Sequence, residues 1–254
     1  MISHMWGVTM RRVLGIAAAL LFVATSGAAQ NITKETIEAD GAKRIFYLFV
    51  PEKLEGKQAP LIITLHGSGR DGRILVDHWK SLASKEGIIL AGPDATKREE
   101  WNTGDDGPAF LYALTEHLKS KYPVDPKRVY LFGHSAGAIH GLAMGVLESE
   151  YFAAIAAHAG VLPQAYASHA RQAPRKIPLG LWVGTNDRFF PVENVRQTRD
   201  AMVHLGFPTE LTEIKGHTHD YYGRSSEINK AAWAYLQKHR LEAEPKYQEY
   251  TINK

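Results

Sequence analysis

A serine stands between small residues at positions 133–137, where the chain reads Gly-His-Ser-Ala-Gly. The pentapeptide fits the pattern G-x-S-x-G and lies between an apolar, β-type run and a helix-forming run. A serine on a strained strand-to-helix turn needs small residues two positions away on each side, and Gly133 and Gly137 meet that need. We therefore expect Ser135 to be a nucleophile. A serine that only caps the following helix is the simpler alternative, but it does not account for both glycines.

A serine hydroxyl becomes a useful nucleophile when a base takes its proton and an acid orients that base. Asp187 lies in the run VGTNDRFFP, directly after the strand-like run 178–184. The carboxyl ends of parallel strands meet at one edge of a sheet, so this carboxylate is expected at the same edge as Ser135. The order serine, acid, histidine then requires the base further along the chain. Ordinary turn chemistry in the run TND is the alternative for Asp187.

Two histidines in the run IKGHTHDYYG are candidates for the base, and they stand two residues apart. A base on this loop has to reach back over the serine turn, which favours His219 because it lies further from the preceding strand. Gly216 directly before His217 suits the other choice. We predict His219 as the base and keep His217 as the alternative. The histidine that is not the base would then line the pocket or support the loop.

The tetrahedral intermediate of an acyl transfer needs backbone N–H donors that are already in place. The run LHGSGRDG at 65–72 follows a strand-like run, as a loop that supplies such a donor should. We predict the N–H groups of Ser68 and Ala136 as the oxyanion hole. The loop lacks the G-K-[ST] ending of a phosphate-binding P-loop and opens no G-x-G-x-x-G unit, so the alternative of a nucleotide site is disfavoured.

The elements that would position these residues alternate along the chain. Short runs rich in apolar and β-branched residues are followed by helical patterns, which predicts an α/β fold with a mostly parallel sheet covered by helices on both faces. Strands are expected at 44–50, 61–66, 88–93, 128–133, 153–160, 178–184 and 210–216, and helices at 74–85, 108–122, 136–149, 192–206 and 226–241.

Composition narrows the function classes. The 254 residues are 44% hydrophobic, which suits one large domain. The formal net charge is +3 and falls to +1 without Arg11 and Arg12, so no basic surface suggests nucleic acid as a partner. With no cysteine, the chain has no thiolate nucleophile and no disulfide framework. Neither a metal nor a cofactor is implied by any motif.

The first 29 residues have the layout of a secretory signal. Arg11 and Arg12 precede an apolar run of about a dozen residues, which is shorter than the roughly 20 residues that span a bilayer, and small residues follow at 28–29. We expect cleavage near this point, a secreted or periplasmic protein and no stable membrane anchor, with residues 1–9 as an upstream extension. Residues 30–241 are the expected catalytic domain, and the polar segment 242–254 is expected to be a frayed tail.

The runs quoted above resemble the α/β-hydrolase superfamily. More narrowly, the chain is similar to the esterases grouped with polyhydroxybutyrate depolymerases and feruloyl esterases. The resemblance covers most of the chain after residue 30 and rests on these runs: PLIITLHGSG, WNTGDDGPAF, VDPKRVYLFGHSAG, YFAAIAAHAGVLP, GTNDRFFP and GHTHDYY. The family often has a cysteine where Ser68 stands. In related dienelactone-hydrolase-like loops an aromatic residue follows the catalytic histidine by two positions, as Tyr221 follows His219.

The resemblance implies a serine carboxylic-ester hydrolase that acts through an acyl-enzyme on a small-molecule ester. Only 17 residues, 161–177, separate two predicted strands, too few for a large helical lid, so we expect an open pocket that suits short-chain or aromatic esters of the feruloyl type. Trp101, Phe189 and Tyr221 are expected to line it. The alternatives are a polyhydroxyalkanoate depolymerase, a peptidase or amidase of the prolyl-oligopeptidase type, and a hydrolase-fold binding protein without turnover. The oligomeric state stays open.

Overall fold

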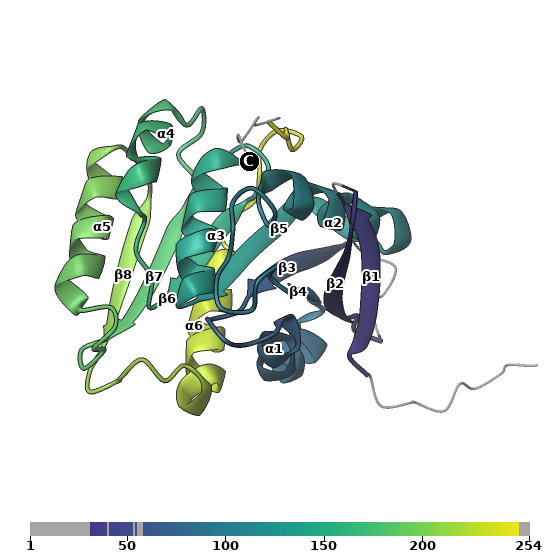
Figure 1. Ribbon diagram of the computed structural model, residues 1–254, viewed down its shortest axis with the longest axis horizontal. Helices are drawn as coiled ribbons and strands as arrows, with labels where there is room; N and C mark the ends of the chain where they lie inside the picture. The colour runs from purple at the N-terminus through teal and green to yellow at the C-terminus, as the bar shows by residue number, and fades with distance from the viewer. Residues whose placement is uncertain (1–30, 40, 53, 55–57, 249–254) are drawn as a thin grey trace, which may run out of the picture.

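An eight-stranded sheet forms the centre of the molecule in the computed structural model, which describes residues 31–39, 41–52, 54 and 58–248 (Figure 1). The strand order is β1-β2-β4-β3-β5-β6-β7-β8. Neighbouring strands from β4 through to β8 are parallel, whereas β1 and β2 are antiparallel to their neighbours. The strands are β1 (Thr33–Ala39), β2 (Ala42–Phe49), β3 (Ala59–Leu65), β4 (Ile89–Pro93), β5 (Val124–His134), β6 (Ala154–His158), β7 (Leu179–Gly184) and β8 (Thr209–Ile214).

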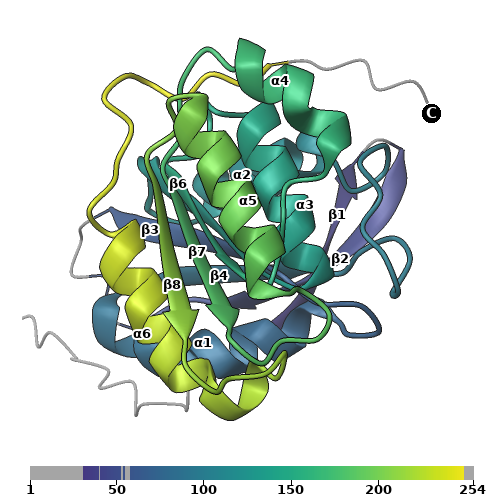
Figure 2. The same cartoon turned by 90° about the vertical axis from the view of Figure 1, so that its left-hand side faces the viewer.

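Helices cover both faces of this sheet (Figures 1 and 2). Helices α1 (Gly72–Glu86) and α6 (Ser225–Leu236) pack together on one face, over a core that includes Trp79 and Phe132. On the other face the core includes Phe110 and Leu142. That face is covered by α2 (Pro108–Lys121), α3 (Ala136–Leu147) and α5 (Val192–His204). The predicted α/β-hydrolase architecture is confirmed.

The central strands are buried along their whole length because both of their faces are covered. Every residue of β3, β4, β6 and β7 is buried, as expected for parallel strands between two helical layers. The predicted strands and helices are all present, with ends that differ by a few residues. The structure adds β1, whose buried residues Ile37 and Ala39 alternate with exposed ones, as in an edge strand with one covered face.

The connection between β6 and β7 is short. It holds a 3₁₀ turn (Gln164–Tyr166) and the six-residue helix α4 (Ala167–Gln172). Within the part of the chain that the structure describes, no large lid is present, as predicted. The carboxyl end of the sheet is therefore reached without crossing a separate cap domain.

The C-terminal segment corrects one expectation. Residues 242–248 are not frayed: the Tyr247 ring stacks on Tyr112 with centroids 4.1 Å apart, and the Gln248 N–H donates to Glu148. The chain is held there by stacking on a residue 135 positions earlier and by a hydrogen bond to a residue 100 positions earlier. Residues 249–254 and the predicted signal segment 1–29 lie outside the described residues. No helix among the described residues is long and apolar enough to cross a membrane.

Candidate active site

Ser135 occupies a strained turn between β5 and α3. Its φ of 57° and ψ of −120° are unusual for a residue with a side chain, and such strain persists where the surrounding structure enforces it. The flanking glycines are required by space. A Cβ on Gly133 would lie 2.2 Å from the Gly137 carbonyl oxygen, and a Cβ on Gly137 would lie 2.0 Å from the Leu65 carbonyl oxygen. The turn therefore has the geometry predicted from G-x-S-x-G.

The predicted base and acid meet the serine at the carboxyl edge of the sheet. His219 Nε2 lies 3.0 Å from the Ser135 hydroxyl, and His219 Nδ1 lies 2.9 Å from Asp187 Oδ2. Figure 2 shows β7 and β8 ending side by side, so the loops that follow them leave the same edge of the sheet. Ser135 and His219, 84 positions apart in the sequence, are thus linked with Asp187 by consecutive hydrogen bonds.

The Asp187 carboxylate is fully buried and held from two sides. Its Oδ1 accepts the backbone N–H groups of Phe189 and Phe190 at 2.9 Å each, while Oδ2 faces His219. Both phenylalanine rings also pack on the His219 imidazole, with centroids 4.8 and 5.6 Å away. The run Asp-Arg-Phe-Phe therefore orients the imidazole by charge and by packing at once.

His217, the alternative base, faces a different partner. Its Nε2 lies 3.1 Å from His158 Nε2 instead of approaching the serine, and its side chain is buried. Burial lowers the pKa of His217, with Arg224 acting in the same direction. The structure brings His219, and not His217, to Ser135.

The loop after β3 passes directly beside the serine. An ideal Cβ on Gly67 would lie 3.3 Å from Ser135 Cβ, and the turn that follows is closed by a hydrogen bond from the Arg70 N–H to the Gly67 carbonyl. Gly69 has a φ of 72°, which favours glycine at this position of the turn. Ala136 begins α3, where backbone N–H groups have no acceptor within the helix. Both predicted oxyanion donors thus belong to backbone next to Ser135.

A cavity of about 470 Å³ opens at Ser135. It adjoins a second hollow of about 650 Å³ along the loops after β7 and β8, and Phe189, His219 and Asp220 line both. Phe189 is 75% exposed, and its contact with substrate stays a prediction. The cavity at the serine is lined by Gly67, Ser68, Arg70, His134, Ser135, Phe189, His219, Asp220 and Tyr222.

Residues 111–238 match the sequence profile of the phospholipase/carboxylesterase family, which is half of the chain. The chain belongs to this family. Solved structures agree on the fold. A ferulic acid esterase superposes with a TM-score of 0.68 at 18% identity, over 82% of this chain and 98% of that one. FphF, a fluorophosphonate-binding serine hydrolase of Staphylococcus aureus, superposes with a TM-score of 0.71 at 12% identity, over 82% and 99%.

Curated relatives are similar over part of their length. A bifunctional acetylxylan esterase/xylanase of Neocallimastix patriciarum is 31% identical over 152 residues, which are 58% of this chain and 22% of the relative. A poly(3-hydroxybutyrate) depolymerase of Ralstonia pickettii is 27% identical over 199 residues, which are 64% of this chain and 40% of the relative. The chain therefore spans less than half the length of these two proteins.

One predicted pocket residue is wrong. Tyr221 is fully buried, and its hydroxyl donates to Asn229 at 2.6 Å, so its side chain faces the core beneath the site. Burial raises the pKa of this phenol well above its ordinary value. The next residue, Tyr222, lines the cavity at Ser135 instead. The chain enters a 3₁₀ turn (Tyr222–Arg224) here, and this sends the two neighbouring tyrosines to opposite sides.

Trp101 is held by the structure but does not line the two cavities described above. Its indole N–H donates to the His66 carbonyl at 2.8 Å, and its ring stacks on His140. Burial lowers the pKa of His140 to about 4, so this imidazole is neutral at physiological pH. A contact between Trp101 and substrate stays a prediction.

A buried carboxylate that the sequence did not single out organises the loop before α2. Asp106 is fully buried and forms an ion pair with Arg44. Its Oδ1 also accepts from the N–H and hydroxyl of Thr96, and its Oδ2 accepts from the N–H of Asn102. The backbone of residues 96–106 thereby surrounds the Asp106 carboxylate. In the sequence, this site is marked only by an acidic pair in a glycine-rich loop.

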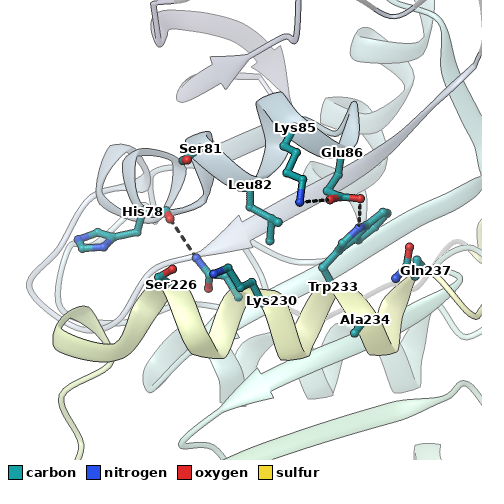
Figure 3. A pocket seen from close by; sticks show the side chains of 11 residues that line it. His78, Ser81, Leu82, Lys85, Glu86, Ser226, Lys230, Trp233, Ala234 and Gln237 are labelled. Carbon is teal, nitrogen blue, oxygen red and sulfur yellow. Dashed lines mark hydrogen bonds and ion pairs between the residues drawn. The ribbon is translucent and has the colours of Figure 1, made fainter.

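A further hollow of about 420 Å³ lies between α1 and α6 (Figure 3). Leu82 and Trp233 face into it among polar and charged side chains, and Trp233 donates to Glu86. It shares no lining residue with the cavity at Ser135. Among the described residues, no cluster of three or more His, Cys, Asp or Glu side chains has the arrangement of a metal site.

Proposed function

We propose that this chain is a serine carboxylic-ester hydrolase in which Ser135, His219 and Asp187 form the catalytic triad. The Ser135 Oγ attacks the ester carbonyl carbon while His219 Nε2 takes the hydroxyl proton. The tetrahedral intermediate collapses as the same Nε2–H protonates the departing alcohol, which leaves an acyl-enzyme on Ser135. Water, deprotonated by His219, then attacks the acyl carbonyl, and the acid and free serine are released.

The observation that carries this proposal is the pair of hydrogen bonds that join Asp187 Oδ2 to His219 and His219 to Ser135 Oγ, with separations of 2.9 and 3.0 Å. Both lie within hydrogen-bond reach for proton transfer. The buried carboxylate would fix the imidazole tautomer with its proton on Nδ1 and stabilise the imidazolium formed during attack. A serine that only capped α3 would need neither partner.

The N–H groups of Ser68 and Ala136 are the proposed oxyanion donors. Ala136 follows Ser135, and Ser68 lies in the loop after β3, where a Cβ on the preceding Gly67 would lie 3.3 Å from Ser135 Cβ. Fixed donors of this kind contribute about 10²–10³-fold each to the turnover rate. Both donors are backbone groups, so side-chain substitution at residue 68 leaves this donor in place.

Short-chain or aromatic esters of the feruloyl type are the proposed substrates. The cavity at Ser135 is bordered by the Phe189 and Tyr222 rings and lacks a lid among the described residues, which suits a compact acyl group and an exposed alcohol. The similarity to the acetylxylan esterase and to the ferulic acid esterase fold supports this class. Similarity to the poly(3-hydroxybutyrate) depolymerase over 64% of the chain favours a hydroxyalkanoate ester as the second candidate.

Export from the cytoplasm is part of the proposal. It rests on the arginine pair, the apolar run and the small residues within positions 10–30 of the sequence. N-terminal sequencing of the protein recovered outside the cytoplasm tests it, because a cleaved signal would leave a new N-terminus near residue 29 or 30. An N-terminus at Met1 or Met10 in that fraction would contradict it.

Turnover of p-nitrophenyl butyrate by the purified protein tests the proposed reaction. We expect Ser135→Ala and His219→Ala each to lose several orders of magnitude in kcat, while His204→Ala, which removes an exposed histidine on α5, keeps wild-type turnover. Methyl ferulate and soluble 3-hydroxybutyrate oligomers then compare the two substrate classes. Turnover that survives Ser135→Ala would remove the nucleophile assignment.

A further inference from the structure

Three buried histidines form a hydrogen-bonded row beside the proposed triad, and none of them belongs to it. His134 Nδ1 lies 3.0 Å from His158 Nδ1, and His158 Nε2 lies 3.1 Å from His217 Nε2. Each residue exposes 5% or less of its surface. They come from the end of β5, the end of β6 and the loop after β8. We call these three residues the histidine row.

The number of ring protons allows the neutral histidine row only two arrangements, which differ in the direction of its hydrogen bonds. A neutral imidazole has one N–H and one bare nitrogen, and a hydrogen bond between two nitrogens needs one of each. His158 uses both of its nitrogens, so in the neutral row it donates to one neighbour and accepts from the other. Both hydrogen bonds therefore point in the same direction along the row. Loss of either end leaves a buried nitrogen of His158 without its partner.

The inner end of the row is fastened to the serine turn. His134 directly precedes Ser135, and its ring lies 5.0 Å from the His219 ring, centroid to centroid. The His158 carbonyl accepts the Ser135 N–H at 3.0 Å. Two members of the row thus hold the residue whose strained φ presents the hydroxyl.

The outer end is fastened to the loops of the acid and the base. His217 stands two residues before His219, and its carbonyl accepts the Asn186 N–H at 2.8 Å, one residue before Asp187. A Cβ on Gly184 would lie 2.1 Å from the same carbonyl oxygen, so the backbones of the two loops touch. A shift of His217 would therefore move both loops relative to the serine.

The surroundings disfavour a positive charge on the histidine row. Burial is the main cause that lowers the pKa of His134 to about 3, followed by the nearby His219. The pKa of His158 lies well below its ordinary value because of burial and the three histidines around it. Three carboxylates, Asp187, Asp220 and Glu227, oppose the lowering at His217, where burial and Arg224 prevail. The Tyr221 and Tyr222 rings cover His134 without adding charge.

We propose that His134, His158 and His217 are positioning residues, whose hydrogen-bonded row holds the His219 loop at the distance from Ser135 that proton transfer requires. The inference rests on the proposed function, because it takes His219 as the base for Ser135. The row acts through these two residues. A displacement of about 1 Å in such an arrangement costs on the order of 10²-fold in rate.

Paired substitutions at His217 separate positioning from simple packing. Leucine at this position fills space without a hydrogen-bonding atom, whereas glutamine places its amide near the position of Nε2. We expect His217→Leu to lower kcat for p-nitrophenyl butyrate about 10- to 100-fold with little change in KM, and His217→Gln to recover most of the loss. His117→Leu, on α2 against Phe46, is the matched control and should behave as wild type.

A double substitution tests whether the residues act as one row. If they do, His134→Leu combined with His217→Leu costs little more than the larger single effect, because the row is already broken. Thermal unfolding of each variant shows whether it is folded. Additive losses, or equal kcat for the Leu and Gln variants when both are folded, would overturn the proposal.

Labelling of Ser135 by a fluorophosphonate separates failure of this inference from failure of the proposed function. The second-order labelling rate reports the activated serine without any ester substrate. If the fluorophosphonate labels Ser135 but the protein hydrolyses no ester, the proposed function fails. The positioning role is then tested by comparing the labelling rates of the same variants. If the fluorophosphonate does not label the wild-type protein, the nucleophile assignment and the positioning role are both wrong.

The protonation of the histidine row is tested by ¹⁵N NMR. His158 should have one protonated ring nitrogen, and two protonated nitrogens would contradict the neutral row.

Discussion

Asp187 and His219 are joined at 2.9 Å although they are 32 residues apart, and the carboxylate is completely enclosed. Because Asp187 accepts two backbone N–H groups on its other oxygen, it has one orientation available. The imidazole that it faces is thereby held with Nε2 toward Ser135.

Asp187→Asn should keep the fold and remove the charge that, in the proposed mechanism, stabilises the imidazolium. We expect kcat to fall about 10⁴-fold, as a side-chain amide also favours the wrong imidazole tautomer. Steady-state kinetics with p-nitrophenyl butyrate measure this. Asp200→Asn, an exposed carboxylate on α5, is the control and should leave kcat unchanged. A loss below tenfold in the folded Asp187 variant would mean that the charge has little part in turnover.

The serine turn should not tolerate a methyl group at residue 137. In Gly137→Ala the new Cβ meets the Leu65 carbonyl 2.0 Å away, which is backbone and cannot swing aside. We expect destabilisation by about 1–3 kcal/mol or more, together with a loss of turnover as Ser135 is displaced.

One helical turn further on, Gly141→Ala provides the matched control. Its Cβ would lie 3.3 Å from Leu65 Cδ1, a side-chain atom that can shift. The gain in helix propensity, up to about 1 kcal/mol, should offset that contact. Urea unfolding and kcat of both variants decide the matter, and equal stabilities would show that the turn is more plastic than its geometry indicates.

Asp106→Asn should destabilise the protein because it leaves the buried Arg44 charge without its partner. Breaking a buried pair from one side costs about 3–5 kcal/mol. Asp105→Asn is the control, since the Asp105 side chain is exposed, while its backbone carbonyl accepts from Arg44 and its backbone N–H donates to Asn102. Urea unfolding midpoints compare the two variants. Similar midpoints would mean that Arg44 finds another partner or water.

The sequence was informative where local pattern and sheet topology act together. Ser135, Asp187 and His219 each follow a parallel strand of the sheet, namely β5, β7 and β8, and parallel strands bring such loops to one edge, so their meeting was predictable. Phe189 was predictable for the same reason. The choice between Tyr221 and Tyr222 was not, because two adjacent tyrosines differ only in which one the 3₁₀ turn sends inward.

Contacts between distant segments explain the other differences. Nothing near Tyr247 indicates that its ring will stack on Tyr112, so residues 242–248 read as a frayed tail. His134 and His158 meet because they are paired in register on neighbouring strands, and no spacing rule in one sequence fixes that register. The Arg44–Asp106 pair joins residues 62 positions apart, one on β2 and one in the loop before α2, and no local sequence pattern indicates it.

Glu148 predicts how stability depends on pH. Its carboxyl group is buried beneath the C-terminal segment, and burial raises its pKa to about 8, although the Gln248 N–H opposes the shift. The folded protein then keeps a proton that the unfolded chain releases above its ordinary pKa of 4.5. Because the folded state binds more protons, this group makes stability fall as pH rises from about 4.5 to 8.

Glu148→Gln stays neutral and should remove this contribution. Its free energy of unfolding, relative to wild type, should therefore increase between pH 5 and pH 8.5, measured by urea unfolding at each pH. Glu99→Gln, at an exposed position, is the control and should run parallel to wild type across the same range. If the free energy of unfolding of Glu148→Gln also runs parallel to wild type across this pH range, the carboxyl group is charged in the folded protein. Hydrogen bonds from water or from the Gln248 N–H would then stabilise the carboxylate.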